Sequence, residues 1–117
     1  MIPAENDNRI DYVELPAAQT ADAKKFYSAA FGWKWQDWGA TYADTNDGRL
    51  GAGINADADS RTKAPLVIVF ALDLEAARER VRNAGGRITR DIFSFPGGRR
   101  FHFRDPAGNE LGVWSKA

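Results

Sequence analysis

The first stretch of the chain alternates in a way that is typical of a strand with two different faces. This alternation runs from Arg9 to Leu15. One face carries Ile10, Tyr12 and Glu14, and the other carries Asp11, Val13 and Leu15. Apolar residues then recur three and four positions apart from Ala23 to Ala30, which predicts an amphipathic helix. We expect Thr20 to cap its N-terminus and Gly32 to end it.

Three short strands are predicted after this helix. They cover Trp33 to Trp38, Ala40 to Asp44 and Arg49 to Asn55, and Asn46-Asp47-Gly48 is a hairpin turn signal between the last two. Residues 56–64 are small and polar. They are therefore interpreted as a linker.

The remaining residues predict the same order of strands and helix. Residues 65–71 form an apolar run typical of a strand buried on both faces, and Asp73 is the expected cap of a second helix that Gly85 ends. Strands are predicted at 87–92, 99–104 and 110–114. In the turn between the last two, we expect Gly108 and Asn109 to adopt positive φ angles.

The order of elements therefore repeats. Each half is predicted to be β-α-β-β-β, with one unit at about 9–55, the linker at about 56–64 and the other unit at about 65–115. The two helix-ending glycines lie 53 positions apart, and the first strands are offset by about the same amount. The 117 residues are expected to form a single domain, 1–117, of class α+β.

Composition narrows the function classes. Sixteen basic residues balance sixteen acidic ones, which argues against a nucleic-acid partner or a membrane surface recognised through net charge. No apolar run is long enough to span a membrane, and no secretory leader is visible at the N-terminus. Cysteine is absent, so disulfides and thiolate chemistry are excluded. A cytoplasmic protein is expected.

Three motifs carry a resemblance to a known family. They are Phe26-Tyr27 followed by Phe31-Gly32-Trp33, Ala84-Gly85-Gly86, and DPAGNELGVW at 105–114. Over roughly residues 9–115 the chain resembles the vicinal oxygen chelate superfamily, the group of glyoxalase I, bleomycin resistance proteins and extradiol dioxygenases. The resemblance implies two βαβββ units forming a cupped mixed β-sheet with helices on the convex side. It also implies a homodimer and a small molecule bound in the cup.

Catalytic members of that family hold a divalent metal on the first, fourth, fifth and eighth strands. The corresponding first, fifth and eighth positions are Tyr12, Leu66 and Gly112, and the fourth strand, RLGAGIN, has neither a carboxylate nor an imidazole. Because a stable site needs three or four converging donors, we expect no metal and no other cofactor. The alternative is an atypical divalent metal site on Glu14, His102 and Glu110.

Side-chain alternation then indicates which residues line the cup. The expected ligand-binding residues are Tyr12, Glu14, Arg100, His102, Glu110 and Trp114. Phe101 and Phe103 should face the helix instead. Arg99 and Arg100 are candidates for contact with an anionic group, because a guanidinium can bind an oxyanion through two hydrogen bonds.

Two functions follow, and whether the chain is an enzyme stays open between them. The first is metal-free binding of a small aromatic or anionic molecule in the cup. The alternative is a lyase or isomerase in which Glu14 or His102 acts as the catalytic base, since an imidazole titrates near neutral pH. An interaction module without a small ligand is a third possibility.

Overall fold

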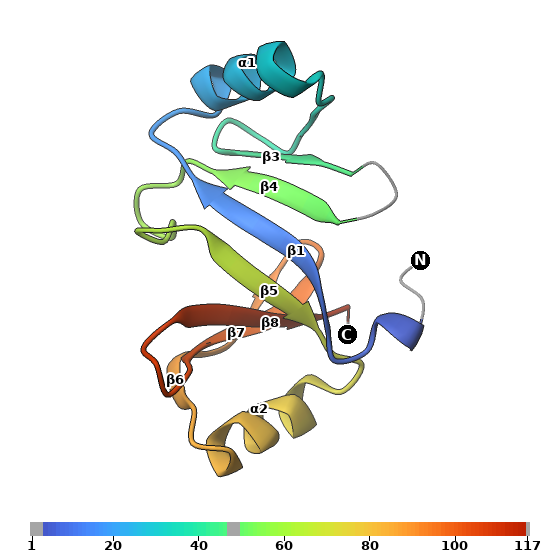
Figure 1. The fold of residues 1–117 in the computed structure, drawn as a ribbon, viewed down its shortest axis with the longest axis vertical. Coiled ribbons are helices and arrows are strands. Elements are labelled where there is room, and N and C mark those ends of the chain that lie inside the picture. The colour runs from blue at the N-terminus through green and yellow to red at the C-terminus, as the bar shows by residue number, and fades with distance from the viewer. Residues whose placement is uncertain (1–3, 47–49, 117) are drawn as a thin grey trace. The chain divides into compact units, whose positions relative to one another are not determined.

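The computed structural model describes residues 4–46 and 50–116, which divide into two compact units (Figure 1). The first unit comprises residues 12–66, and the second comprises residues 4–11 and 67–116. The first strand, β1 (Arg9–Pro16), contributes its first three residues to the second unit and the rest to the first. Over these described ranges, neither α-helix has the length and apolar character needed to cross a membrane.

The first unit contains one helix and a four-stranded mixed sheet. Its elements after β1 are α1 (Thr20–Phe31), β2 (Gln36–Asp37), β3 (Tyr42–Thr45) and β4 (Gly51–Asn55). The strand order is β2-β3-β4-β1, in which β1 runs parallel to β4 and the other neighbours are antiparallel. This unit is therefore βαβββ, as predicted.

The second unit has the same plan. A short 3₁₀ turn (Ala4–Asn6) precedes β1, and the main elements are β5 (Leu66–Phe70), α2 (Leu74–Asn83), β6 (Arg87–Phe95), β7 (Gly98–Arg104) and β8 (Glu110–Ser115). Its strand order is β6-β7-β8-β5, with β5 parallel to β8. The two sheets thus share one topology, which confirms the predicted duplication and the α+β fold class.

The core of the second unit lies between α2 and one face of its sheet. Leu74 and Ala77 of α2 are buried against Phe101 and Val113, and Phe101 is wholly inaccessible to solvent. Phe103 packs against the same cluster. The prediction that Phe101 and Phe103 face the helix is therefore confirmed, and the residues between them must point away from it.

The helix α1 differs from α2 in how its apolar residues are used. It ends as predicted at Gly32, which has a left-handed φ of 73° and donates its N–H to the Ser28 carbonyl. The predicted cap was wrong by one residue, because Gln19 occupies that position and the Thr20 hydroxyl donates instead to the Ala40 carbonyl at 3.1 Å. None of its residues is buried, and Phe26 is 60% exposed.

Two turn predictions have mixed outcomes. Gly108 has the expected positive φ of 92°, but Asn109 does not, since Asn8 is the only non-glycine with positive φ among the described residues. Asn109 instead donates its backbone and side-chain N–H groups to the Asp105 carboxylate at 2.9 and 3.1 Å. Two residues of the turn signal Asn46-Asp47-Gly48, at positions 47 and 48, lie outside the described ranges, as does residue 49, where the next strand was predicted to begin.

The strand boundaries also shifted. The strand predicted at 33–38 is reduced to the two residues Gln36–Asp37. The strand predicted at 87–92 continues to Phe95. Trp33 stacks on Tyr27 of α1 and Trp35 makes a tilted contact with it, at ring-centroid distances of 5.1 and 6.2 Å, and neither tryptophan enters the sheet.

The cap of α2 gives a first test of the fold. Asp73 accepts a hydrogen bond from the Ala76 backbone N–H at 3.0 Å, as its predicted role requires. We expect Asp73→Ala to lower the free energy of unfolding by about 1 kcal/mol, measured by urea denaturation. Asp59→Ala, which removes an exposed carboxylate from the linker, is the control. Equal losses in the two variants would contradict the capping role.

The ion pair between α2 and β7 gives a second test. Arg99 contacts both Glu75 carboxylate oxygens, at 2.6 and 3.1 Å, and this pairing lowers the pKa of Glu75 to about 2. Since the folded pKa is lowered, the stabilisation is present at neutral pH and is lost as the pH falls toward 2. Carboxyl NMR titration should show this low midpoint, and Arg99→Gln should raise it. An unchanged midpoint in Arg99→Gln would show that the pair does not set it.

Candidate functional site

The sheet of the second unit presents a polar and aromatic face on the side away from α2. Arg100 and His102 of β7 project there, because they alternate with the core residue Phe101. In the register with β8, Arg100 is opposite Trp114 and His102 is opposite Gly112. The ladder thus brings three of the predicted site residues onto one face.

A histidine–carboxylate contact lies on this face. The Nδ1 atom of His102 is 3.3 Å from the Oε2 atom of Glu110. The Thr89 hydroxyl donates to the same carboxylate oxygen at 3.4 Å. His102 is only 3% exposed, whereas the Glu110 side chain is partly accessible. The arrangement orients the imidazole through one ring nitrogen, as a carboxylate does for a base.

Five rings, including the imidazole of this pair, form two contacting groups on the same face, Phe70–Trp114–Phe95 and Phe93–His102, which we together call the aromatic row. Neighbouring ring centroids are 5.3 Å apart for Phe70–Trp114, 6.3 Å for Phe95–Trp114 and 5.8 Å for Phe93–His102. These distances lie within the range of favourable edge and tilted contacts. The rings meet at interplanar angles of 52–66°, so they give this face an apolar but uneven surface bordered by polar groups.

The guanidinium of Arg100 lies over this row. Its central carbon is 5.4 Å from the ring centroid of Phe93 and 5.7 Å from that of Phe95. Both distances are within the reach of cation–π attraction. Arg99, in contrast, is engaged by Glu75 on the α2 side, so the two arginines that follow the glycines serve different faces.

Trp114 is held by a residue that the sequence did not single out. Its indole N–H donates to the Asp11 carboxylate, at 3.0 Å to Oδ1 and 3.3 Å to Oδ2. Partial burial raises the pKa of Asp11, and the hydrogen bond from Trp114 opposes that rise. Asp11 therefore fixes the plane of the indole at one end of the aromatic row.

The first unit has a separate polar network around Glu14. Glu14 is 1% exposed and accepts hydrogen bonds from the Tyr42 hydroxyl at 2.9 Å and from the Asn55 side-chain amide at 3.3 Å. The Tyr12 and Tyr42 hydroxyl oxygens are 2.7 Å apart. Because the single proton of Tyr42 is directed to Glu14, Tyr12 is the donor in this contact. The predicted pair Tyr12 and Glu14 is thus joined through Tyr42.

Burial and the neighbouring charge keep Tyr42 protonated. Desolvation is the main cause that raises the pKa of Tyr42, and the negative charge of Glu14 raises it further. Gly53 lies opposite Glu14 in the ladder, and a side chain there would collide with the hydroxyls of Tyr12 and Tyr42. The network therefore requires glycine at position 53.

Sequence reasoning missed several of these residues. They are Asp11, Tyr42, Asn55, Thr89 and Phe93. For Tyr42 and Asn55 a signal existed, since both lie on predicted strands and alternation could have been extended to them. Their selection also needed the register between β3 and β4, in which the two residues are direct partners.

The donor set does not suit the divalent metal of the family's catalytic members. Leu66 is apolar and 1% exposed, Gly112 has no side chain, and the Tyr12 hydroxyl donates to Tyr42. Within residues 4–46 and 50–116, no three or more histidine or acidic side chains are grouped so that they could hold a metal ion. We therefore derive no chemical step through a metal.

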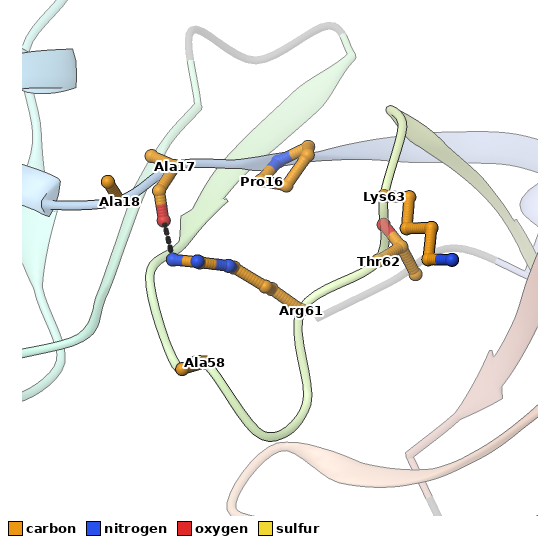
Figure 2. Close-up of a pocket in the computed structure, with 7 residues that line it drawn as sticks. All are labelled: Pro16, Ala17, Ala18, Ala58, Arg61, Thr62 and Lys63. Carbon is orange, nitrogen blue, oxygen red and sulfur yellow. Dashed lines mark hydrogen bonds between the residues drawn. The ribbon is translucent and has the colours of Figure 1, made fainter.

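An open hollow of about 520 Å³ lies at the linker of the first unit (Figure 2). It is lined by Pro16, Ala17, Ala18, Ala58, Arg61, Thr62 and Lys63. Arg61 donates to the Ala17 carbonyl at 2.7 Å, whereas the Lys63 ammonium points away from the Arg61 guanidinium. The two charges do not converge, and the hollow contains none of the predicted site residues.

Solved structures of several enzymes share this fold. A methylmalonyl-CoA epimerase from Mycobacterium tuberculosis is 16% identical with a TM-score of 0.73, covering 100% of this chain and 93% of its own. A protein described as an NAD-dependent benzaldehyde dehydrogenase from Legionella pneumophila is 13% identical with a TM-score of 0.75, covering 91% and 98%. A Mn(II)-bound glyoxalase from Novosphingobium aromaticivorans is 22% identical with a TM-score of 0.66, covering 94% and 39%.

Comparison of the sequence with curated proteins and with protein families gives two further results. No curated protein matches the sequence. The structural likenesses, all at low identity, establish the fold alone. The model of the Glyoxalase/Bleomycin resistance protein/Dioxygenase superfamily matches residues 9–113, which include both βαβββ units and all of the predicted site residues except Trp114. The chain belongs to this superfamily.

Proposed function

We propose that this protein binds a small aromatic or anionic molecule without the divalent metal of its catalytic relatives. The observation that carries the proposal is the aromatic row on the sheet face away from α2, with a guanidinium over it and a histidine–carboxylate pair beside it. Small-molecule sites combine apolar and aromatic surface with a few oriented polar groups. The aromatic row supplies the first part, and Arg100, His102 and Glu110 supply the second.

The side chains on this face favour an aromatic ligand, because aromatic rings also attract one another in tilted and edge-to-face contacts. Trp114 is fixed at its indole nitrogen by Asp11, so its ring plane is set before any ligand arrives. A preorganised aromatic surface costs little conformational entropy on binding. Tyr12 and Glu14 remain proposed ligand contacts as well, since a buried hydrogen-bonded carboxylate and phenol can select a ligand by its polar groups.

The alternative is a lyase or isomerase that removes a proton from carbon. The contact between His102 Nδ1 and Glu110 Oε2 favours His102 as the base, because an imidazole oriented by a carboxylate can accept a proton at its other ring nitrogen. Glu14 is the second candidate. Its two oxygens already accept hydrogen bonds from Tyr42 and Asn55, so a substrate proton would have to compete with these donors.

The proposed partner beyond the ligand is a second copy of the chain, as the family resemblance suggests. The first unit supports this proposal by exposing Phe26, Phe31 and Trp33, whose rings are joined with that of Tyr27 through contacts at centroid distances of 5.1–6.5 Å. Contiguous apolar surface of this kind marks interaction sites in many proteins. A cytoplasmic location remains a prediction from the composition.

Ligand binding can be tested with a panel of one- and two-ring aromatic compounds, both neutral and negatively charged. We expect some of them to raise the melting temperature and to bind in calorimetry. Trp114→Ala and Phe93→Ala should each weaken that binding about tenfold, because each removes an aromatic contact surface. Trp38→Ala, which removes an exposed tryptophan from the first unit, should leave the affinity unchanged.

Two outcomes would redirect this proposal. Equal losses in Trp114→Ala and Trp38→Ala would place binding away from the aromatic row. The second outcome is that a bound compound exchanges a carbon-bound proton with deuterated solvent. If His102→Gln abolishes that exchange, the protein is a lyase or isomerase with His102 as its base, and not a binding protein alone. Binding with no exchange supports the proposal as stated.

Metal content provides an independent measurement. Protein purified without a chelator or a histidine tag should contain far less than one zinc, nickel or iron ion per chain, because three or four donors do not converge in the part of the chain that the structure describes. A chelator should then leave ligand affinity and melting temperature unchanged. A stoichiometric metal that is lost in both Glu14→Ala and His102→Ala would show that an atypical site exists.

A further inference from the structure

The strand β6 is irregular on both sides of one arginine. Its register with β7 shifts between Ile88 and Arg90 and again between Arg90 and Phe93. Ile88 and Ile92 both pack against the α2 core. In an unbroken strand Arg90, two residues from each, would point into that core as well. The first shift instead places Arg90 opposite His102, on the face away from α2.

This displacement puts the Arg90 guanidinium against an aromatic ring. Its central carbon lies 3.6 Å from the ring centroid of Phe93, closer than the Arg100 guanidinium, which is 5.4 Å from the same ring. A contact at 3.6 Å is well within the range of cation–π stacking, which holds the guanidinium against the ring of Phe93. Bulges are a common means of re-aiming a side chain beside a functional site.

Two acidic residues adjoin Arg90, Asp91 in the sequence and Glu110 through its contact with Thr89, and both have other partners. Asp91, the next residue, forms an ion pair with Arg78 of α2 at 2.7 Å. Glu110 contacts His102 and Thr89. Among the described residues, Arg90 has no acidic partner in the ion pairs of the structure and is solvent-exposed. Its charge is therefore available to an incoming group, and its orientation is already set by Phe93.

We propose that Arg90, stacked on Phe93, is the specificity residue that binds the carboxylate of a planar aromatic acid whose ring lies on the aromatic row. This inference rests on the proposed function and narrows its ligand class from aromatic or anionic molecules to those that are both. The planar fork of an arginine matches the two oxygens of a carboxylate. A ring attached to that carboxylate continues in the same plane, toward the aromatic row.

A matched pair of probes tests the inference. The probes are 2-naphthoate and 2-naphthamide, which differ in charge and share the same rings. By calorimetry we expect the protein to bind the naphthoate at least about tenfold more tightly, since hydrogen bonds to charged groups are the stronger ones. Arg90→Gln should abolish that preference while leaving the affinity for naphthamide. Arg90→Lys should retain only part of it, because an ammonium lacks the planar fork.

The control is Arg87→Gln. Arg87 is exposed on the same strand, three residues away, so this variant removes the same charge without touching Phe93. It should keep the full preference for naphthoate. Circular dichroism and melting curves establish whether each variant is folded. If Arg90→Gln does not fold, the preference for naphthoate is compared between Arg90→Lys and the unmodified protein instead.

The results distinguish a failure of the proposed role of Arg90 from a failure of aromatic-ligand binding itself. If neither probe binds the unmodified protein or competes with a ligand found in the aromatic panel, the inference is overturned. If both bind with equal affinity, the aromatic site stands and the role of Arg90 fails. If Arg87→Gln loses the preference as Arg90→Gln does, the effect is general electrostatic attraction, and the specific role of Arg90 fails again.

Discussion

The packing of α2 on its sheet is the constraint from which the candidate site follows. Phe101 of β7 is completely buried in the core beneath α2. Successive side chains of a strand point to opposite faces unless the strand bulges. Once Phe101 faces the helix, Arg100 and His102 must face the other side. A slip of one residue would place a guanidinium and an imidazole in the apolar core, at a cost of several kcal/mol. The core thus determines which side chains are available for chemistry.

A second constraint operates in the first unit, where a carboxylate is buried. Glu14 is 1% exposed, and a buried charge is tolerated only when hydrogen bonds replace its lost water. Tyr42 and Asn55 supply donors to its two oxygens, and Tyr12 orients Tyr42. Removing one partner would leave part of the charge unsatisfied, which costs more than the hydrogen bond itself contributes. Gly53 is part of the same arrangement, because it gives the two phenols the room to meet.

The features that were predictable are those encoded by local pattern. Asp73, Gly32 and the alternation around Phe101 each act within a few residues of sequence, so the order of elements and the faces of β7 could be inferred. The exposure of the apolar residues of α1 and the hydrogen-bond partners of Glu14 depend on which strands and helices pack together. A local sequence pattern does not contain that information. That the two sheets together enclose a cup stays a prediction.

The most informative case is β6, where local pattern predicts the wrong face for one residue. Alternation from Ile88 and Ile92 assigns Arg90 to the core, and only the register shifts reverse this. An arginine at a core position in an otherwise regular strand is therefore a signal in itself: either its charge is paired inside, or the strand bulges to expel it. Here the strand bulges.

The repeat also shows how one scaffold can carry different chemistry in its two units. Pairing between equivalent strands places Tyr42 opposite Asn55 in the first unit and Arg100 opposite Trp114 in the second. The strand order is shared, and at this pair of strands the difference between the units lies in the side chains. One unit uses its position to satisfy a buried carboxylate, which produces a rigid, closed network. The other uses it to spread a guanidinium over aromatic rings, which leaves a surface that a ligand can still join. At this ladder position the first unit has side chains that hydrogen-bond a buried carboxylate, whereas the second unit has a cation over aromatic rings. Substitutions in the second unit can therefore alter binding specificity with less damage to the fold.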